Sequence, residues 1–177
     1  MNSRSTRLSF GLILFVAGMA YLPYMLQIGY AFDDWYLMWA AKAEGPNVFH
    51  AIYAVDRPVR GFVLSWAYQL FGENVLWYNL SAFAFRVLGA AAFWWWVRQL
   101  WPGAKRLVAA MALLYVVYPG FLSQLNGIDY QSQIIALCFA MLSLALTVKA
   151  FLPPDGMRHR IIWLLVAALT GWIDRKS

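Results

Sequence analysis

The order of apolar and polar positions divides this chain into long apolar segments joined by polar connections. Five segments are candidate membrane-spanning helices, at residues 8–26, 75–97, 107–122, 134–151 and 161–173. A helix needs about 20 apolar residues to cross the hydrocarbon core of a bilayer, so the fifth segment is short for a span. The pattern predicts an all-α fold, a polytopic transmembrane bundle of about five helices that forms one domain over residues 1–177.

The connection between the first two spans, residues 27–74, is long and carries a helical pattern of its own. In "DDWYLMWAAKA", Asp33 and Asp34 stand at a helix start, where carboxylates favour the helix dipole, and Trp35, Met38 and Trp39 repeat at helical spacing. This stretch predicts a first short amphipathic helix on the outer membrane face.

A second amphipathic helix is predicted in "PVRGFVLSWAYQLFG". Pro58 suits the first helical position and Gly72 suits the end, and between them lies an apolar set of Phe62, Val63, Trp66 and Leu70. We expect this helix to lie in the outer interface as well.

Composition supports a membrane protein. The chain is 63% hydrophobic and 12% charged, whereas a soluble domain carries about a quarter charged residues. Its 10 tryptophans suit interfacial belts. The net charge of +6 does not indicate a nucleic-acid partner, because the basic residues lie mainly beside apolar runs. Cys138 is the single cysteine, which excludes an intrachain disulfide.

The basic residues predict the orientation. Two of them, Arg4 and Arg7, precede the first span. The others lie in or beside the second and fourth connections: Arg98, Lys105, Arg106, Lys149, Arg158 and Arg160. By the positive-inside rule, we expect a multi-pass protein of the inner (cytoplasmic) membrane with its N-terminus in the cytoplasm. All acids except Asp155 then fall outside. Arg4 and Arg7 before an apolar run also fit a signal peptide, but the run is long and lacks a convincing cleavage site, which favours an uncleaved span.

The first candidate site lies in the long outer connection and comprises Asp33, Asp34, Asp56, Arg57 and Arg60. Adjacent acids just outside a membrane can supply a general base or bind a divalent metal, and arginines can hold a phosphate through two parallel hydrogen bonds. The alternative is that all five are solvated charges that cap two interfacial helices.

Two further candidates lie elsewhere. Arg86 falls near the middle of the second span, where a charge is costly without a partner, so we expect it inside the bundle near Asp129 or an amide. Asp129 and Gln131 belong to an amide-rich second outer turn that can bind sugar hydroxyls. The alternatives are a shifted span with Arg86 reaching the headgroups, and an ordinary polar turn.

The order of these parts resembles that of the GT-C superfamily of membrane glycosyltransferases. A first span is followed by an outer loop with an acidic pair and interfacial helices, and then by a tight bundle. The likeness rests on "AFDDWYLM", "DRPVRGFVLSWAYQLFG", "WWWVRQLWPG" and "YPGFLSQ". It implies a sugar donor linked to polyprenyl phosphate, with Asp33 or Asp34 as the base for the acceptor hydroxyl. It also implies that Arg57, and less directly Arg60, holds the lipid phosphate.

The chain departs from the GT-C pattern in its number of spans, because the resemblance implies roughly eight to thirteen. We therefore expect the chain to be the N-terminal part of a larger bundle, from an interrupted or truncated gene. The competing hypothesis is a non-catalytic membrane subunit or scaffold in envelope-polymer assembly, with membrane lipids and another membrane protein as its partners.

Overall fold

The computed structural model describes residues 3–118, 127–152 and 157–175, and every regular element in these ranges is a helix. The predicted all-α class is confirmed. The elements are α1 (Ser3–Met25), α2 (Asp34–Glu44), α3 (Val48–Ile52), α4 (Pro58–Phe71), α5 (Val75–Leu100), α6 (Lys105–Val116), α8 (Gln131–Phe151) and α9 (Met157–Arg175).

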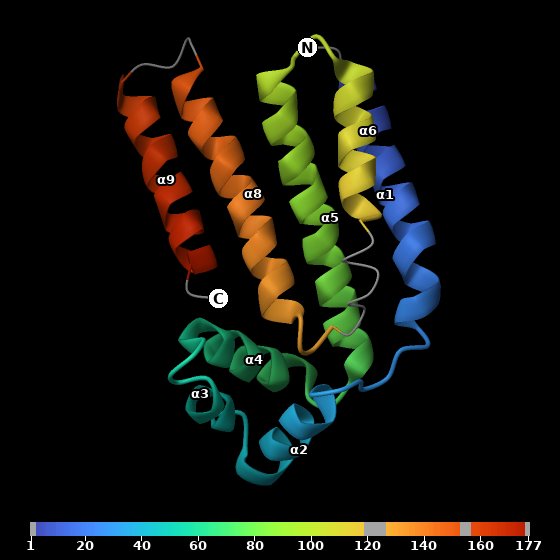
Figure 1. The fold of residues 1–177 in the computed structure, drawn as a ribbon, viewed down its shortest axis with the longest axis vertical. Helices are drawn as coiled ribbons and strands as arrows, with labels where there is room; N and C mark the ends of the chain where they lie inside the picture. Colours follow the sequence, from blue (N-terminus) through green and yellow to red (C-terminus); the bar gives the residue numbers. More distant parts are fainter. Residues whose placement is uncertain (1–2, 119–126, 153–156, 176–177) are drawn as a thin grey trace.

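The helices form two layers (Figure 1). The long helices α1, α5, α6, α8 and α9 stand side by side, and the shorter α2, α3 and α4 lie across one end of them. α5 is central, since it packs against α1, α6 and α8, and α8 in turn packs against α9. We call the end that carries α2, α3 and α4 the covered end, and the opposite end the open end.

Three helices are long and apolar enough to cross a membrane, by length and composition: Leu8–Met25, Val75–Leu100 and Gln131–Phe151. They correspond to the first, second and fourth predicted spans. α6 has 12 residues and rises about 18 Å, less than the thickness of the hydrocarbon core. The predicted third span, 107–122, ends in residues that lie outside the described part. In α9 the apolar stretch Arg160–Leu169 is shorter than a span.

Both predicted amphipathic helices are present, as α2 and α4. α4 begins with Pro58 and is followed by Gly72, whose φ of 58° is readily adopted by glycine. The five-residue α3 between them was not predicted, because it is too short to show a helical period. The structure also shows which face of α4 points outward: Phe62, Trp66 and Leu70 are exposed, whereas Arg60 is buried.

Two apolar clusters hold the layers together. One lies inside the bundle between α1, α5 and α6 and is built on Ile13, Ala17, Tyr21, Met25, Val87, Ala90, Ala112 and Val116. The other joins the short helices to the covered end of α5 and to Ile128, with Leu37, Met38, Ala41, Phe49, Leu64, Ala67 and Tyr78. The second cluster fixes α2–α4 against the bundle and so positions the charged residues between them.

Candidate functional site

Asp34 connects the long loop between α1 and α5 to the segment that enters α8. It is the first residue of α2 and is 1% exposed. Its Oδ2 accepts a hydrogen bond from the backbone amide of Ala31 at 3.1 Å, and its Oδ1 accepts one from the backbone amide of Asp129 at 2.9 Å. Both carboxylate oxygens are therefore engaged by backbone groups that are distant from each other in sequence.

Asp129 is also bound through its own side chain. Its carboxylate forms an ion pair with Nη2 of Arg60, which projects from α4. The Arg60 side chain is 5% exposed and that of Asp129 is 18% exposed. The Arg60 guanidinium lies over the ring of Tyr53, 4.5 Å from its centroid. Asp34, Asp129 and Arg60 therefore form one buried chain of charged groups between α2, α4 and the start of α8. We call it the outer network.

Two glycines allow the backbones around the outer network to approach closely. A Cβ atom on Gly61 would lie 2.7 Å from the carbonyl oxygen of Phe49, so glycine lets α4 pack against α3. A Cβ on Gly127 would lie 2.7 Å from Oδ1 of Asn79. That oxygen accepts a hydrogen bond from the Gly127 amide, and this anchors the segment before α8 to α5.

Tyr53 is surrounded by charges from the predicted site. Burial raises its pKa, the positive charge of Arg60 opposes that shift, and the negative charges of Asp129 and Asp33 add to it. Arg57 acts in the same direction as Arg60. The Tyr53 hydroxyl thus lies within electrostatic range of two acids and two arginines, and it stays protonated at neutral pH. Nothing in the sequence pattern had singled out Tyr53.

Asp33 differs from its neighbour Asp34 in exposure. It is exposed, occupies the N-cap position of α2, and makes no side-chain capping hydrogen bond. Phe32 before it is 87% exposed and has a φ of 48°, in the left-handed region that phenylalanine rarely adopts. The pair of acids is therefore divided into one buried, fully bonded carboxylate and one carboxylate open to solvent next to a strained residue.

Asp56 and Arg57 lie near the surface. Arg57 Nε is 3.2 Å from Oδ2 of Asp56, and their side chains are 41% and 72% exposed respectively. The charges of Arg57 and Asp33 both act on the Tyr53 hydroxyl, with opposite effects on its pKa. The two arginines at the start of α4 therefore have different environments: Arg60 is buried in the outer network, whereas Arg57 at the N-cap is half-exposed.

Gln131 lies at the start of α8, where Nε2 donates a hydrogen bond to Oγ of Ser81 at 2.6 Å. Gln131 Oε1, Ser132 Oγ and Arg60 Nε are buried and have no hydrogen-bond partner in the described part of the chain. Gln131 and Asp129 thus lie at the covered end, with Asp34 and Arg60 of the first candidate site. Asn79 was not a candidate, although its side chain also bonds to the carbonyls of Met25 and Ile28, each at 3.3 Å.

Arg86 lies inside the bundle, as predicted. Its guanidinium is over the ring of Tyr21, 4.8 Å from the centroid, and Tyr21 donates a hydrogen bond to the Val116 carbonyl at 2.6 Å. Asp129, suggested as a neighbour for Arg86, is bound to Arg60 instead. The reason is that Asp129 lies at the covered end, whereas Arg86 is about three turns further along α5.

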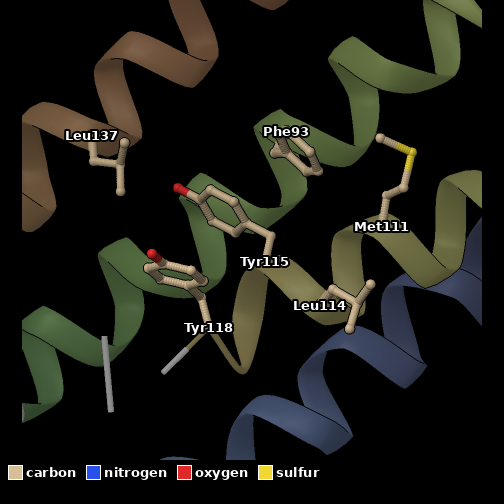
Figure 2. Close-up of a pocket in the computed structure, with 6 residues that line it drawn as sticks. All are labelled: Phe93, Met111, Leu114, Tyr115, Tyr118 and Leu137. Atoms are coloured by element: carbon tan, nitrogen blue, oxygen red, sulfur yellow. The ribbon is translucent and has the colours of Figure 1, made fainter. Parts of the chain in front are cut away.

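An apolar groove of about 470 Å³ opens between α5, α6 and α8 (Figure 2). It is lined by Phe93, Met111, Leu114, Tyr115, Tyr118 and Leu137. The hydroxyl groups of the two tyrosines point toward α8 (Figure 2). A smaller cavity, of about 20 Å³, shares Tyr115 and Leu137 with the groove and is also lined by Arg86.

Over the described residues, no group of three or more His, Cys, Asp or Glu side chains is arranged to hold a metal ion. Comparison with known proteins found no match to a family model, a curated protein or a solved structure.

Proposed function

We propose that this membrane protein is part of a GT-C-like glycosyltransferase. The transfer would move a sugar from a polyprenyl-phosphate donor to an envelope acceptor at the covered end, with the N-terminus in the cytoplasm. The proposal is supported by one observation: the exposed carboxylate of Asp33 and the half-exposed guanidinium of Arg57 belong to the same loop region, and the charge of each acts on Tyr53. An acid and a phosphate-binding cation, placed at the end of a membrane bundle, are what such a transfer needs.

The proposed step moves one proton and one glycosyl group. The Asp33 carboxylate takes the proton of the acceptor hydroxyl as its oxygen bonds to the anomeric carbon of the donor. The bond between that carbon and the phosphate oxygen breaks, and the phosphate leaves with the electron pair. Arg57 stabilises the departing charge through paired hydrogen bonds.

Asp33 is the better candidate for the base. Both oxygens of Asp34 accept backbone hydrogen bonds, and its side chain is closed off from solvent. A base must come within hydrogen-bond reach of the proton that it removes. Asp33 meets that requirement by its exposure, and we assign Asp34, Arg60 and Asp129 the role of holding the loop.

The test is a transfer assay with polyprenyl-phosphate sugars, using the purified chain and, where the reading frame continues past Ser177, the longer protein. Asp33→Asn should lower kcat by a factor of about a hundred to ten thousand. Arg57→Lys keeps the charge without the paired geometry and should raise KM for the donor. Glu44→Gln is the matched control, since it removes an exposed acid from the far end of the same helix, α2. Parental activity in Asp33→Asn would reject Asp33 as the base.

A second candidate function is a non-catalytic membrane subunit, and a different observation favours it. The outward faces of α2 and α4 carry the exposed Trp35, Trp39, Phe62 and Trp66, an arrangement suited to contact with another apolar surface. Photo-crosslinkers at Trp39 and Trp66 would distinguish the two functions. A single crosslinked membrane protein, together with no detectable transfer by any form of the chain, supports the subunit.

A further inference from the structure

The outward face of α4 consists mainly of large apolar side chains. Phe62, Trp66 and Leu70 follow one another at intervals of four residues, so they form one row along the helix, and they are 55%, 69% and 78% exposed. We call this row the α4 ridge. Gln69 is the only polar residue among the exposed positions of α4, and the single charged residue of the helix, Arg60, is buried.

This arrangement is the reverse of that in a helix on the surface of a soluble protein. Such a helix turns its apolar stripe to the core and its charged residues to water. In contrast, α4 buries its arginine in the outer network and exposes two aromatic rings and a leucine. An apolar medium or an apolar surface against the ridge makes this arrangement favourable.

The C-terminal end of α4 is fixed to a helix of membrane-spanning length. Phe71, the last residue of α4, stacks on Trp77 in the first turn of α5, with ring centroids 6.5 Å apart and ring planes inclined by 21°. The Tyr78 hydroxyl donates a hydrogen bond to the Gly72 carbonyl at 2.9 Å. These contacts hold the end of α4 at the level where α5 begins, and a span begins at the bilayer surface.

The orientation of α4 keeps the rest of the helix near that level. α4 lies crosswise to α5 and α8 at the covered end (Figure 1), and it packs against both. Its 14 residues rise about 21 Å. Because this length runs across the bundle, the α4 ridge extends along the bilayer surface and not away from it.

We infer that the α4 ridge lies in the bilayer at the covered end, at the boundary between headgroups and hydrocarbon. The occupant of this face is lipid, because the stack of Phe71 on Trp77 places the ridge at the depth where lipid surrounds the spans. Aromatic and leucine side chains on a helix that lies along the membrane are typical of that boundary. The inference concerns how α4 is placed in the membrane and does not depend on the proposed transfer reaction.

The experiment measures the depth of the ridge with spin labels. Phe62→Cys, Trp66→Cys and Leu70→Cys are made one at a time in a chain that carries Cys138→Ala, because Cys138 is the only cysteine. Each variant is labelled with a nitroxide and reconstituted in bilayers of phosphatidylcholine and phosphatidylglycerol. Power saturation then compares the access of oxygen, which concentrates in hydrocarbon, with that of a nickel chelate, which stays in water.

Glu44→Cys is the matched control, because Glu44 is also exposed and lies at the charged end of α2 beside Lys42. We expect the ratio of oxygen access to nickel access to be several-fold higher at the three ridge positions than in Glu44→Cys. The labels replace exposed side chains, so the variants are expected to fold, which a single symmetric elution peak verifies.

Two results would overturn the inference. Ridge labels that the nickel chelate reaches as readily as it reaches the control label lie in water. Ridge labels that neither reagent reaches are covered by protein, either a second copy of the chain or a partner subunit. If the Cys138→Ala chain aggregates, a benzophenone crosslinker at Trp66 in the chain that keeps Cys138 decides: a lipid adduct supports the inference, and a protein adduct or none contradicts it.

Discussion

The Asp34 carboxylate accepts a hydrogen bond at 2.9 Å from the backbone amide of Asp129, a residue 95 positions further along the chain. The side chain of Asp129 then pairs with Arg60 on α4. Three segments of the covered end, namely the start of α2, the start of α4 and the approach to α8, are held by this one chain of contacts. The buried acid of the "DD" pair is thereby committed to the fold, and its neighbour Asp33 remains open to solvent.

The two adjacent acids should respond differently to removal. Asp34→Ala leaves two backbone amides, those of Ala31 and Asp129, without their hydrogen-bond acceptor and should destabilise the protein by about 2–6 kcal/mol, at about 1–3 kcal/mol for each buried unsatisfied group. Asp33→Ala removes no capping hydrogen bond and should change the free energy of unfolding by about 0.5 kcal/mol or less. Thermal unfolding of both variants in detergent checks this, and equal losses would contradict it.

The Arg60–Asp129 ion pair should be costly to break. Arg60→Leu leaves the Asp129 carboxylate largely buried without its cation, and breaking a buried pair costs about 3–5 kcal/mol. Arg57→Leu is the matched control, because its pair with Asp56 is exposed and such pairs contribute about 1 kcal/mol or less. The free energies of unfolding of the two variants should differ accordingly. If Arg60→Leu loses no more stability than Arg57→Leu, the outer network does not hold the loop.

Replacing the strained Phe32 with glycine should raise the stability of the protein slightly. Phe32 has a φ of 48° and an almost fully exposed side chain, so Phe32→Gly relieves the left-handed strain, about 1–2 kcal/mol, and loses little packing. Part of that gain is offset by the greater freedom of glycine in the unfolded chain. We expect a small rise in the unfolding midpoint. A clear fall would show that the Phe32 side chain makes a stabilising contact, for instance with lipid.

Because α3 and α4 approach closely at Gly61, a larger residue there should destabilise the protein. In Gly61→Ala the new methyl group would lie 2.7 Å from the Phe49 carbonyl oxygen, and such overpacking costs about 1–3 kcal/mol. Gly103→Ala provides the control, because nothing lies within 4 Å of its added Cβ. The difference should appear in thermal unfolding. Gly61→Ala that is as stable as Gly103→Ala would mean that the two helices separate easily.

Arg86 should contribute to the stability of the helix bundle. Arg86→Leu removes a charge that lies over the Tyr21 ring inside the bundle, and the yield extracted from membranes and the unfolding midpoint should both fall. Arg98→Leu, which removes the other arginine stacked on a ring in α5 but near the end of the helix, should have the smaller effect. Unchanged yield and midpoint in Arg86→Leu would show that the interior charge has no structural role.

The sequence by itself determined the class of the protein and the helices that flank the site. Apolar runs long enough to cross a bilayer have few alternatives to helix, because every backbone polar group in lipid needs a partner within its own segment. The same local logic predicted α2 and α4, since Pro58 and Gly72 mark the ends of α4 through their own backbone geometry. These conclusions depend only on residues that are neighbours in the chain, so composition and the spacing of apolar positions are enough to reach them.

Only the tertiary structure decided which of the candidate residues meet. Asp34 and Asp33 are adjacent and chemically identical, and their division into a buried and an exposed carboxylate depends on the amide of Asp129, which arrives from a distant segment. Tyr53 gains its charged surroundings, and Arg86 its place over Tyr21, in the same way. Long-range packing selects one partner among many of equal chemistry, and no periodicity in the sequence encodes that choice.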